Sequence, residues 1–243
     1  RSTLQRHSFP TRRSSDLFRR LLSPPLHSAP IPLNVLAVAP RSFWLSTRTA
    51  PTQSGVLEDY ASAIEYAFAT YPDSKFVLYG HSLGGAATLL LLRSPDLRRR
   101  ISGVVLENPL PSIPYMVAAL YPQRWLPYHY LGPFVLDRWD AITALRKDDV
   151  LEGVPSLWIR SGRDEIIPVG GMERLWEAAK EEEGVERRWI EIKGALHDTA
   201  FLEKSWRGGT RCRGFWRGGG EGTVRDEFGS FDLAPSARTA LIS

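Results

Sequence analysis

A serine in a glycine-rich turn is the strongest chemical signal in this 243-residue sequence. The segment Gly80-His81-Ser82-Leu83-Gly84 fits the pattern G-x-S-x-G, follows the apolar run FVLY (76–79) and precedes a segment rich in Ala and Leu. On a tight turn between a strand and a helix, such a serine is exposed for attack on a carbonyl carbon, and the small neighbours avoid collisions of Cβ atoms with the backbone. We predict Ser82 as the nucleophile. The N–H of Leu83, at the start of the helix, is predicted to stabilise the oxyanion.

A serine nucleophile needs a base and a carboxylate that orients the base. Asp164 lies in the segment SGRDEIIP (161–168), directly after the strand-like run SLWI (156–159). Ligands of open α/β sheets bind at the carboxyl ends of strands, so Asp164 is the predicted acid. The adjacent Glu165 is its rival, with a side chain expected to point elsewhere. The structural alternative for Asp164 is a loop acid that caps the following helix.

The predicted base is His197, in the segment KGALHDT (193–199) after the last strand-like run. On this kind of sheet the order along the chain is serine, acid, histidine, and His197 alone among the five histidines follows both Asp164 and a strand end. His81 precedes the nucleophile inside the turn, so we do not expect its ring to approach the serine from the side of the base. The alternative is that His197 is a solvent-facing loop residue.

An insert over about 109–140 is predicted to form a cap over the site. It contains six prolines and seven aromatic residues without a clear helix or strand pattern. Aromatic side chains there would suit an acyl chain, and we single out Tyr115, Trp125 and Trp139 as candidate substrate-binding residues. The alternative, equally open from the sequence, is that these rings pack against the sheet.

The elements that must hold these residues alternate between two types along the chain. A helix capped by Ser54 and ending before Pro72, another over 86–92 and a third over about 172–182 are predicted from the spacing of apolar residues. Such alternation indicates an α/β domain with a parallel, doubly wound sheet and right-handed crossovers. The short apolar runs predicted as strands are 34–39, 76–79, 103–106, 156–159 and 188–192.

Composition limits the class of protein further. Apolar residues make up 43% of the chain and the net charge is +4, which describes a globular domain rather than a disordered one. Cys212 is the single cysteine, so an intrachain disulfide framework and a Cys-rich zinc site are excluded. The sequence has no run of 18 apolar residues that would span a bilayer. The predicted chemistry requires neither metal nor cofactor.

The two ends of the sequence differ from the middle. Residues 1–32 are rich in Arg, Ser and Pro, and we expect a disordered or non-native segment there, either a transit peptide or a translated sequencing-adapter remnant. The hydrolytic domain is expected over 33–206. Residues 207–243 are expected to form a Gly/Arg-rich disordered tail; single-stranded nucleic-acid binding by this tail is the alternative, but we expect no nucleic-acid partner.

The segments GHSLGG (80–85), VLENPLPSIPYM (105–116), SGRDEIIP (161–168) and GALHDT (194–199) together resemble the α/β-hydrolase superfamily. The similarity is strongest to the bud-emergence-protein branch that includes α/β-hydrolase domain-containing protein thirteen, and extends over about 35–206. The resemblance implies a serine hydrolase of acyl esters or thioesters, including S-acylated proteins, with the triad Ser82, Asp164 and His197. It also implies endomembrane association of relatives through an N-terminal hydrophobic segment.

Several departures from that branch put activity in doubt. The segment RSFWLST (41–47) has Ser42 where the branch has glycine, and His197-Asp198-Thr199 lacks one residue of the usual His-Asn-Asp-Thr. No His-Gly dipeptide, which would supply the second oxyanion donor, occurs in the sequence. We expect the first strands of the fold and the membrane anchor to be missing, so that this chain by itself reads as soluble. The alternative function is therefore a catalytically incomplete fragment.

Overall fold

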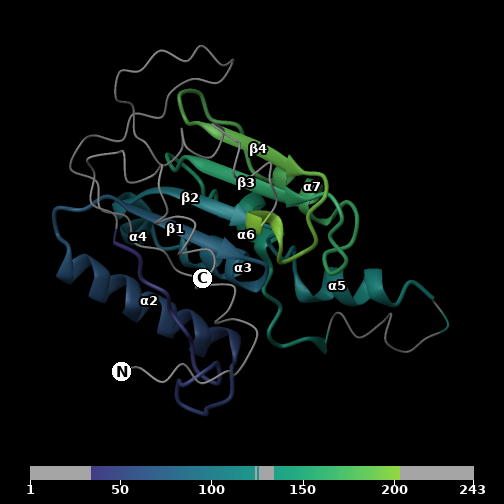
Figure 1. The fold of residues 1–243 in the computed structure, drawn as a ribbon, viewed down its shortest axis with the longest axis horizontal. Helices are drawn as coiled ribbons and strands as arrows, with labels where there is room; N and C mark the ends of the chain where they lie inside the picture. The colour runs from purple at the N-terminus through teal and green to yellow at the C-terminus, as the bar shows by residue number, and fades with distance from the viewer. Residues whose placement is uncertain (1–33, 124, 126–133, 203–243) are drawn as a thin grey trace.

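The computed structural model describes residues 34–123, 125 and 134–202 (Figure 1). The predicted segments 1–32 and 207–243, the tail with its Arg-Gly tract and part of the predicted cap lie outside the described residues. The helices and strands are α2 Gln53–Thr70, β1 Phe76–His81, α3 Leu83–Leu91, α4 Pro95–Arg100, β2 Ile101–Glu107, α5 Ile113–Leu120, α6 Ala141–Lys147, β3 Ser156–Ser161, α7 Gly171–Ala178, β4 Arg187–Ile192 and the 3₁₀ helix η4 Ala200–Leu202.

The four described strands form one parallel sheet in the order β1-β2-β3-β4 (Figure 1). Each connection moves one strand further in the same direction. Crossovers of one hand then place every connecting helix on the same face of the sheet. The carboxyl ends of all four strands meet at one edge, and the segments that carry Ser82, Asp164 and His197 follow β1, β3 and β4 at that edge.

The main core lies between the sheet and this helical layer. Side chains from α2, α3, α6 and α7 contact one face of the strands in a single cluster, with the fully buried Trp158 of β3 among them. A smaller cluster covers the other face and includes Val77, Tyr79 and Ala200. The alternation along β1 explains this division, because successive side chains of a strand point to opposite faces: Phe76 and Leu78 enter the first cluster.

Some predicted elements differ from those in the structure. Residues 34–39 are not a strand, although Leu36 and Val38 contact the main cluster and Val35 the smaller one. Burial on both sides produced the apolar pattern, but no described strand pairs with the segment. The cap of α2 is Thr52, whose Oγ1 accepts from the N–H of Gly55 at 3.3 Å, rather than the predicted Ser54.

In the described part of the predicted cap region one helix stands out, α5, which extends beyond the sheet (Figure 1). Ser112 caps it by accepting a hydrogen bond from the N–H of Tyr115, and Pro114 stands in the first turn, where its missing N–H is tolerated. Pro114, one of the prolines of the insert, therefore helps to begin this helix. Within α5 only Met116 is buried, because most of the helix lies away from the core.

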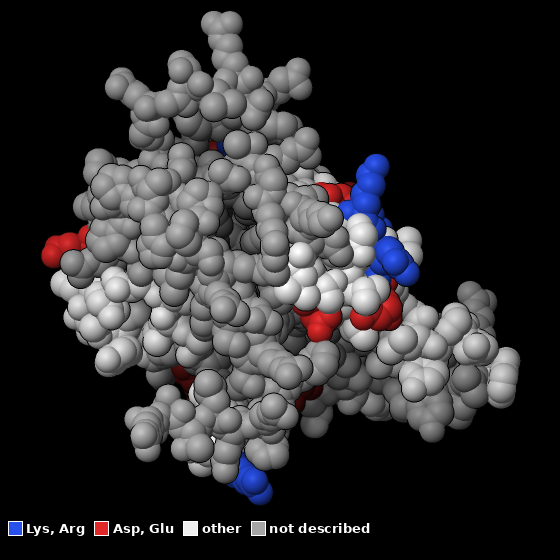
Figure 2. Space-filling model, viewed as in Figure 1, with Lys and Arg blue, Asp and Glu red and all other residues white. Residues whose placement is uncertain are grey.

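Charged side chains of both signs share the described surface. In the view of Figure 2, Lys and Arg atoms lie beside Asp and Glu atoms on the exposed part of the molecule. Several ion pairs join the two signs, among them Arg41 with Asp59 and Arg93 with Asp148. This mixture agrees with the small net charge of the sequence.

Candidate active site

Ser82 occupies a strained turn between β1 and α3. Its φ of 53° lies in the left-handed region, which a residue with a side chain rarely adopts. Two hydrogen bonds hold the turn, one to the last residue of β2 and one to the segment after it: Ser82 N donates to the carbonyl of Glu107 at 3.0 Å, and the N–H of Leu110 donates to the Ser82 carbonyl at 2.9 Å. Strain of this kind persists only where the surrounding structure fixes it, and it is common at functional sites.

The glycines around Ser82 allow β1 and α3 to approach closely. A Cβ on Gly80 would lie 2.6 Å from the carbonyl oxygen of Gly84 and 2.6 Å from Oγ1 of Thr88. A Cβ on Gly85 would lie 2.7 Å from Cβ of Pro109. The predicted reason for small residues at this turn is therefore visible directly as backbone contact.

Leu83 is the first residue of α3. The N–H groups of the first helical turn have no acceptor within the helix, and the helix dipole favours negative charge at this end. The backbone of Leu83 therefore follows directly on Ser82, at a position where an N–H is open to a developing negative charge.

The structure brings Asp164 and His197 together. His197 Nδ1 lies 2.8 Å from Oδ2 of Asp164, and both side chains are largely buried, at 9% and 11% exposed. Oδ1 of the same carboxyl accepts hydrogen bonds from the N–H groups of Ile166 and Ile167, each at 2.8 Å. The carboxyl thus has one oxygen fixed by the backbone and the other directed at the imidazole.

The protonation states of this pair follow from its surroundings. Burial raises the pKa of the Asp164 carboxyl, but the hydrogen bonds with His197 and with the backbone of Ile167 and Ile166 outweigh burial, and the net pKa lies below 3.8. An ionised carboxylate is only an acceptor, so Nδ1 of His197 must be the donor. This tautomer leaves the lone pair on Nε2 of a neutral His197, which is the form that a general base requires.

Glu165, the rival acid, makes a different contact. Its Oε2 accepts a hydrogen bond from the backbone N–H of His197 at 3.0 Å. The two neighbouring acids therefore contact the same histidine at different places, Asp164 at the ring and Glu165 at the main chain. This difference follows from adjacent residues in a loop pointing in different directions.

Two further residues, His81 and Asn108, contact His197, and neither was predicted to belong to the site. The His81 ring lies 4.7 Å from the His197 ring, and its Nε2 is 2.9 Å from the His197 carbonyl oxygen. Asn108, directly after β2, donates from Nδ2 to the same carbonyl at 2.7 Å. We did not expect the His81 ring on the side of the serine where the base lies, yet it lies beside His197. The sequence signals for Asn108 were its place at the end of an apolar strand and within the segment VLENPLPSIPYM (105–116) that carries the family resemblance.

The segments of Ser82 and His197 are linked by the contacts of His81 and Asn108, and not by a hydrogen bond between the two side chains. Among the described residues, no hydrogen bond joins Ser82 Oγ to the His197 ring. Hydrogen bonds of this kind are often long without substrate and shorten only in the complex. The contact between His81 and His197 nevertheless places the serine turn next to the histidine loop.

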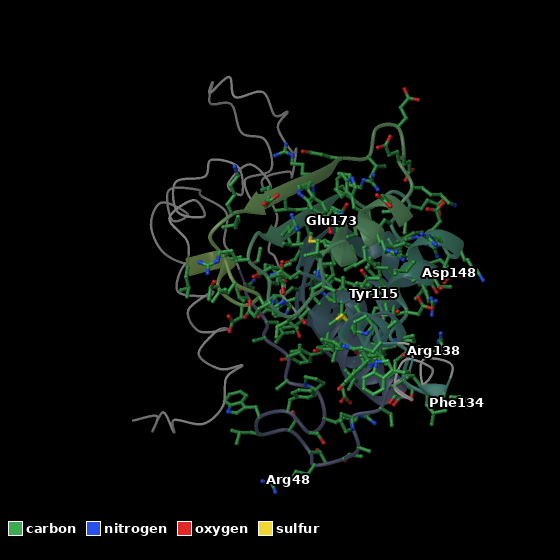
Figure 3. The ribbon with its side chains drawn as sticks, turned by 90° about the vertical axis from the view of Figure 1, so that its right-hand side faces the viewer. Arg48, Tyr115, Phe134, Arg138, Asp148 and Glu173 are labelled. Atoms are coloured by element: carbon green, nitrogen blue, oxygen red, sulfur yellow. The ribbon has the colours of Figure 1, made fainter. Side chains whose placement is uncertain are left out.

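The three candidate substrate-binding residues occupy different environments. Tyr115 is half-buried near the beginning of α7, against Gly171, and Figure 3 shows it toward the centre of the molecule, with Phe134 at the margin. Trp125 is 80% exposed. Trp139 is 5% exposed and belongs to the main core cluster, because its φ of 47° and the bond from its N–H to Oε1 of Gln53 turn it inward. Packing, the alternative reading of the cap, accounts for Trp139.

Within the described ranges, no group of three or more His, Cys, Asp or Glu side chains is arranged to hold a metal ion. No helix of the described part of the chain is long and apolar enough to cross a membrane.

A serine on a strand-to-helix turn and a His–Asp pair at the carboxyl edge of a parallel sheet define the class of α/β hydrolases. The Alpha/beta hydrolase family matches residues 7–209 of the sequence, and the chain belongs to this family. The match begins within the segment 1–32.

Curated relatives confirm the predicted resemblance to the bud-emergence-protein branch. Protein bem46 of Schizosaccharomyces pombe is 30% identical over 139 residues, which cover 56% of this chain and 43% of that protein. The α/β hydrolase domain-containing protein WAV2 of Arabidopsis thaliana is 26% identical over 163 residues, covering 63% of this chain and 50% of WAV2. The chain thus spans about half the length of these relatives.

Solved structures with a similar fold include a monoacylglycerol lipase from Paleococcus ferrophilus, at 24% identity and a TM-score of 0.40, covering 66% of this chain and 72% of that one. An α-β hydrolase from Vibrio vulnificus has 18% identity and a TM-score of 0.48, covering 65% of this chain and 55% of that one.

Proposed function

We propose that this protein is a serine hydrolase that cleaves acyl esters or thioesters. The observation that supports it most is the 2.8 Å contact between Nδ1 of His197 and the carboxyl of Asp164, held beside the strained turn of Ser82. A histidine oriented by a carboxylate and beside a serine on a strand-to-helix turn is the arrangement that activates a hydroxyl for acyl transfer.

The reaction has two halves. His197 Nε2 takes the proton of Ser82 Oγ as the oxygen attacks the carbonyl carbon, and the tetrahedral oxyanion is stabilised by the N–H of Leu83. His197 then gives the proton to the leaving alcohol or thiol, which departs and leaves an acyl-enzyme on Ser82. Water, deprotonated by His197, attacks that ester; His197 then returns the proton to Ser82 Oγ as the C–O bond breaks and the carboxylic acid is released.

Apolar side chains exposed in the insert support an apolar acyl group as substrate. Side chains exposed in and near the insert include Leu120, Trp125, Phe134 and Leu136, at 61–96% exposure. Exposed apolar groups of this size suit a hydrocarbon chain better than a charged substrate. A protein S-acyl group is within this class, because its thioester presents the same carbonyl and a similar chain.

The alternative is a chain that has the triad residues but lacks full activity. An oxyanion hole normally has two donors, and the sequence contains no His-Gly dipeptide to supply the second. Loss of one such donor lowers kcat by about 10²–10³-fold. A fragment of this kind would fold and yet turn over its substrate slowly.

Labelling by a fluorophosphonate probe tests the proposal directly. We expect the purified chain to be labelled, and Ser82→Ala and His197→Ala to be unlabelled, because the probe requires an activated serine. The matched control is Ser62→Ala, which removes an exposed serine of α2 whose hydroxyl donates to the carbonyl of Glu58. This variant should be labelled like the parent. A folded but unlabelled parent chain would contradict the proposal and favour the incomplete fragment.

p-Nitrophenyl esters of increasing chain length, beside an acyl thioester, then distinguish substrates. An apolar acyl site predicts that kcat/KM rises with chain length for several carbons, by up to about 0.8 kcal/mol of binding for each buried CH₂. Equal values for acetate and octanoate esters would contradict the acyl-chain part of the proposal.

A further inference from the structure

The turn after β2, residues 107–110, contacts the segments of both Ser82 and His197. The carbonyl of Glu107 and the N–H of Leu110 hold the backbone of Ser82, while Asn108 Nδ2 donates to the carbonyl of His197. The strand order explains this position. Because β2 lies between β1 and β3, its carboxyl end emerges between the serine turn and the acid loop.

The Asn108 amide uses every group that it presents. Nδ2 donates to the His197 carbonyl at 2.7 Å and to Oγ of Ser161 at 2.8 Å, and Oδ1 accepts from the N–H of Ser161 at 2.7 Å. A backbone N–H can only donate, so the atom that faces Ser161 N must be oxygen and the amide has one allowed orientation. At 1% exposure, water does not compete for these bonds.

The backbone of Asn108 is fixed as well. Its φ of 43° is in the left-handed region, and its N–H donates to the carbonyl of Ile159 on β3 at 2.9 Å. Asparagine accepts this conformation more readily than most residues that have a side chain. The conformation lets a residue at the end of β2 bond to β3 with its main chain and to the histidine loop with its side chain.

His197 needs such a support because of its place in the sheet. It follows β4, which lies three strands from β1, and with strands about 4.8 Å apart the starting points of the two loops are about 14 Å apart. The loop after β4 must therefore return across the ends of β3 and β2. Its carbonyl at His197 is held by two donors, Asn108 Nδ2 and His81 Nε2.

We propose that Asn108 is a positioning residue, which holds the backbone of His197 so that its Nε2 meets the proton of Ser82. The effect of Asn108 on catalysis rests on the proposed function, whereas its support of the His197 backbone rests on the hydrogen bonds alone. Asn108 need not touch substrate. Its effect is on the orientation of the base and therefore on kcat.

Two variants separate the side chain from the backbone. Asn108→Gly allows the left-handed φ and removes the amide, and Asn108→Asp keeps the shape but replaces the donor to His197 with an acceptor. Because a misplacement of about 1 Å can cost 10²-fold, we expect kcat to fall by about 10–100-fold in both, with KM within about twofold of the parent. The matched control is Ser156→Ala, another buried polar residue, at the opposite end of β3, which should keep its kcat.

Hydrogen exchange of the full chain measures how firmly the His197 loop is held, and it does not require activity. We expect amides of residues 194–199 to exchange at least about tenfold faster in Asn108→Gly than in the parent, while amides of β1–β4 stay protected. Ser156→Ala should leave the 194–199 segment unchanged.

The outcomes distinguish this inference from the proposed function. A loosened 194–199 segment together with a specific loss of kcat supports both. If the 194–199 segment is loosened but the parent does not react with a fluorophosphonate, the support of His197 by Asn108 is confirmed and the proposed hydrolase function is contradicted. Unchanged exchange, or an equal loss of kcat in Ser156→Ala, overturns the role of Asn108.

Discussion

At the scale of single residues, the imidazole of His197 is held from several directions. Asp164 holds its ring nitrogen, Glu165 its backbone N–H, and Asn108 and His81 its carbonyl. A general base works only when its free nitrogen is aimed at the nucleophile, so these contacts together set its geometry. They differ in chemistry, however, and therefore in the expected effect of removing them.

Asp164 and Glu165 should differ sharply in their effect on catalysis. Asp164→Asn removes the charge that stabilises the imidazolium and permits the wrong tautomer, and we expect kcat/KM for a p-nitrophenyl ester to fall by about 10³–10⁴-fold. Glu165→Gln keeps an acceptor for the N–H of His197 and should cost less than about tenfold. Steady-state kinetics on both variants checks this. Equal losses would mean that Glu165 shares the role assigned to Asp164.

The lowered pKa of Asp164 predicts a pH dependence of stability. A carboxyl whose pKa is lower in the folded than in the unfolded state contributes stability above the unfolded value of 3.8. That contribution is lost as the pH falls through the folded pKa. Between about pH 5 and pH 2, the free energy of unfolding of the parent should therefore fall more than that of Asp164→Asn. Urea denaturation followed by circular dichroism measures the difference, and parallel curves would contradict it.

At the scale of elements, the crossing of β1 and α3 determines where Ser82 is. The helix begins at the residue after Ser82 and approaches β1 so closely that Gly80 has no room for a Cβ. A tight crossing forces the left-handed backbone of the serine. The same closeness makes the crossing sensitive to any added volume.

Gly80→Ala should damage both stability and activity. The new methyl would meet backbone atoms of Gly84 and Gly85 at 2.6 and 2.7 Å, and overpacking of this kind costs about 1–3 kcal/mol. Displacement of Ser82 should lower kcat/KM by about 10²-fold.

Gly184→Ala is the matched control for this prediction. Its φ of +81° makes alanine strained, by about 1–2 kcal/mol, but no atom lies within 4 Å of a Cβ there. It should lose stability and keep its kcat/KM. Thermal unfolding and ester kinetics on both variants test these expectations. A fully active Gly80→Ala would show that the turn tolerates the displacement.

At the scale of the whole molecule, a parallel sheet with its connecting helices on one face determines which aromatic residues remain available for binding. Trp139 joins α2 to the core through Gln53 and lies in the main cluster, whereas Trp125 is exposed. Both were equal candidates in the sequence, since each is a tryptophan in the same Pro-rich insert. Their burial separates them.

Trp139→Ala should therefore act mainly on stability. Removal of a buried tryptophan leaves a cavity, and we expect a loss of about 3–5 kcal/mol in the free energy of unfolding. Trp125→Ala, at an exposed position, should change stability by less than about 0.5 kcal/mol. Chemical denaturation of both variants tests the assignment. A stable Trp139→Ala would place its ring outside the core.

Particular residues show which features of the structure could be predicted from the sequence. Ser82, Asp164 and His197 could be proposed as a triad from the sequence because the G-x-S-x-G turn is local and each of the other two follows a strand in the chain order of this fold. The α/β class followed from alternating apolar patterns in the same way. The strand predicted at 34–39 and the cap at Ser54 were wrong, because burial on two sides looks like a strand in sequence and two neighbouring hydroxyl residues compete for one cap position.

The sequence by itself determined the α/β class and the family, and it predicted a serine, an acid and a histidine for the site, because these depend on local patterns and on chain order. Only the tertiary structure showed that Asp164 rather than Glu165 faces the imidazole, that Asn108 and His81 hold its backbone, and that Trp139 is a core residue. Those outcomes depend on which strands become neighbours. Neighbouring strands are joined by hydrogen bonds between segments far apart in the chain, which no local pattern records.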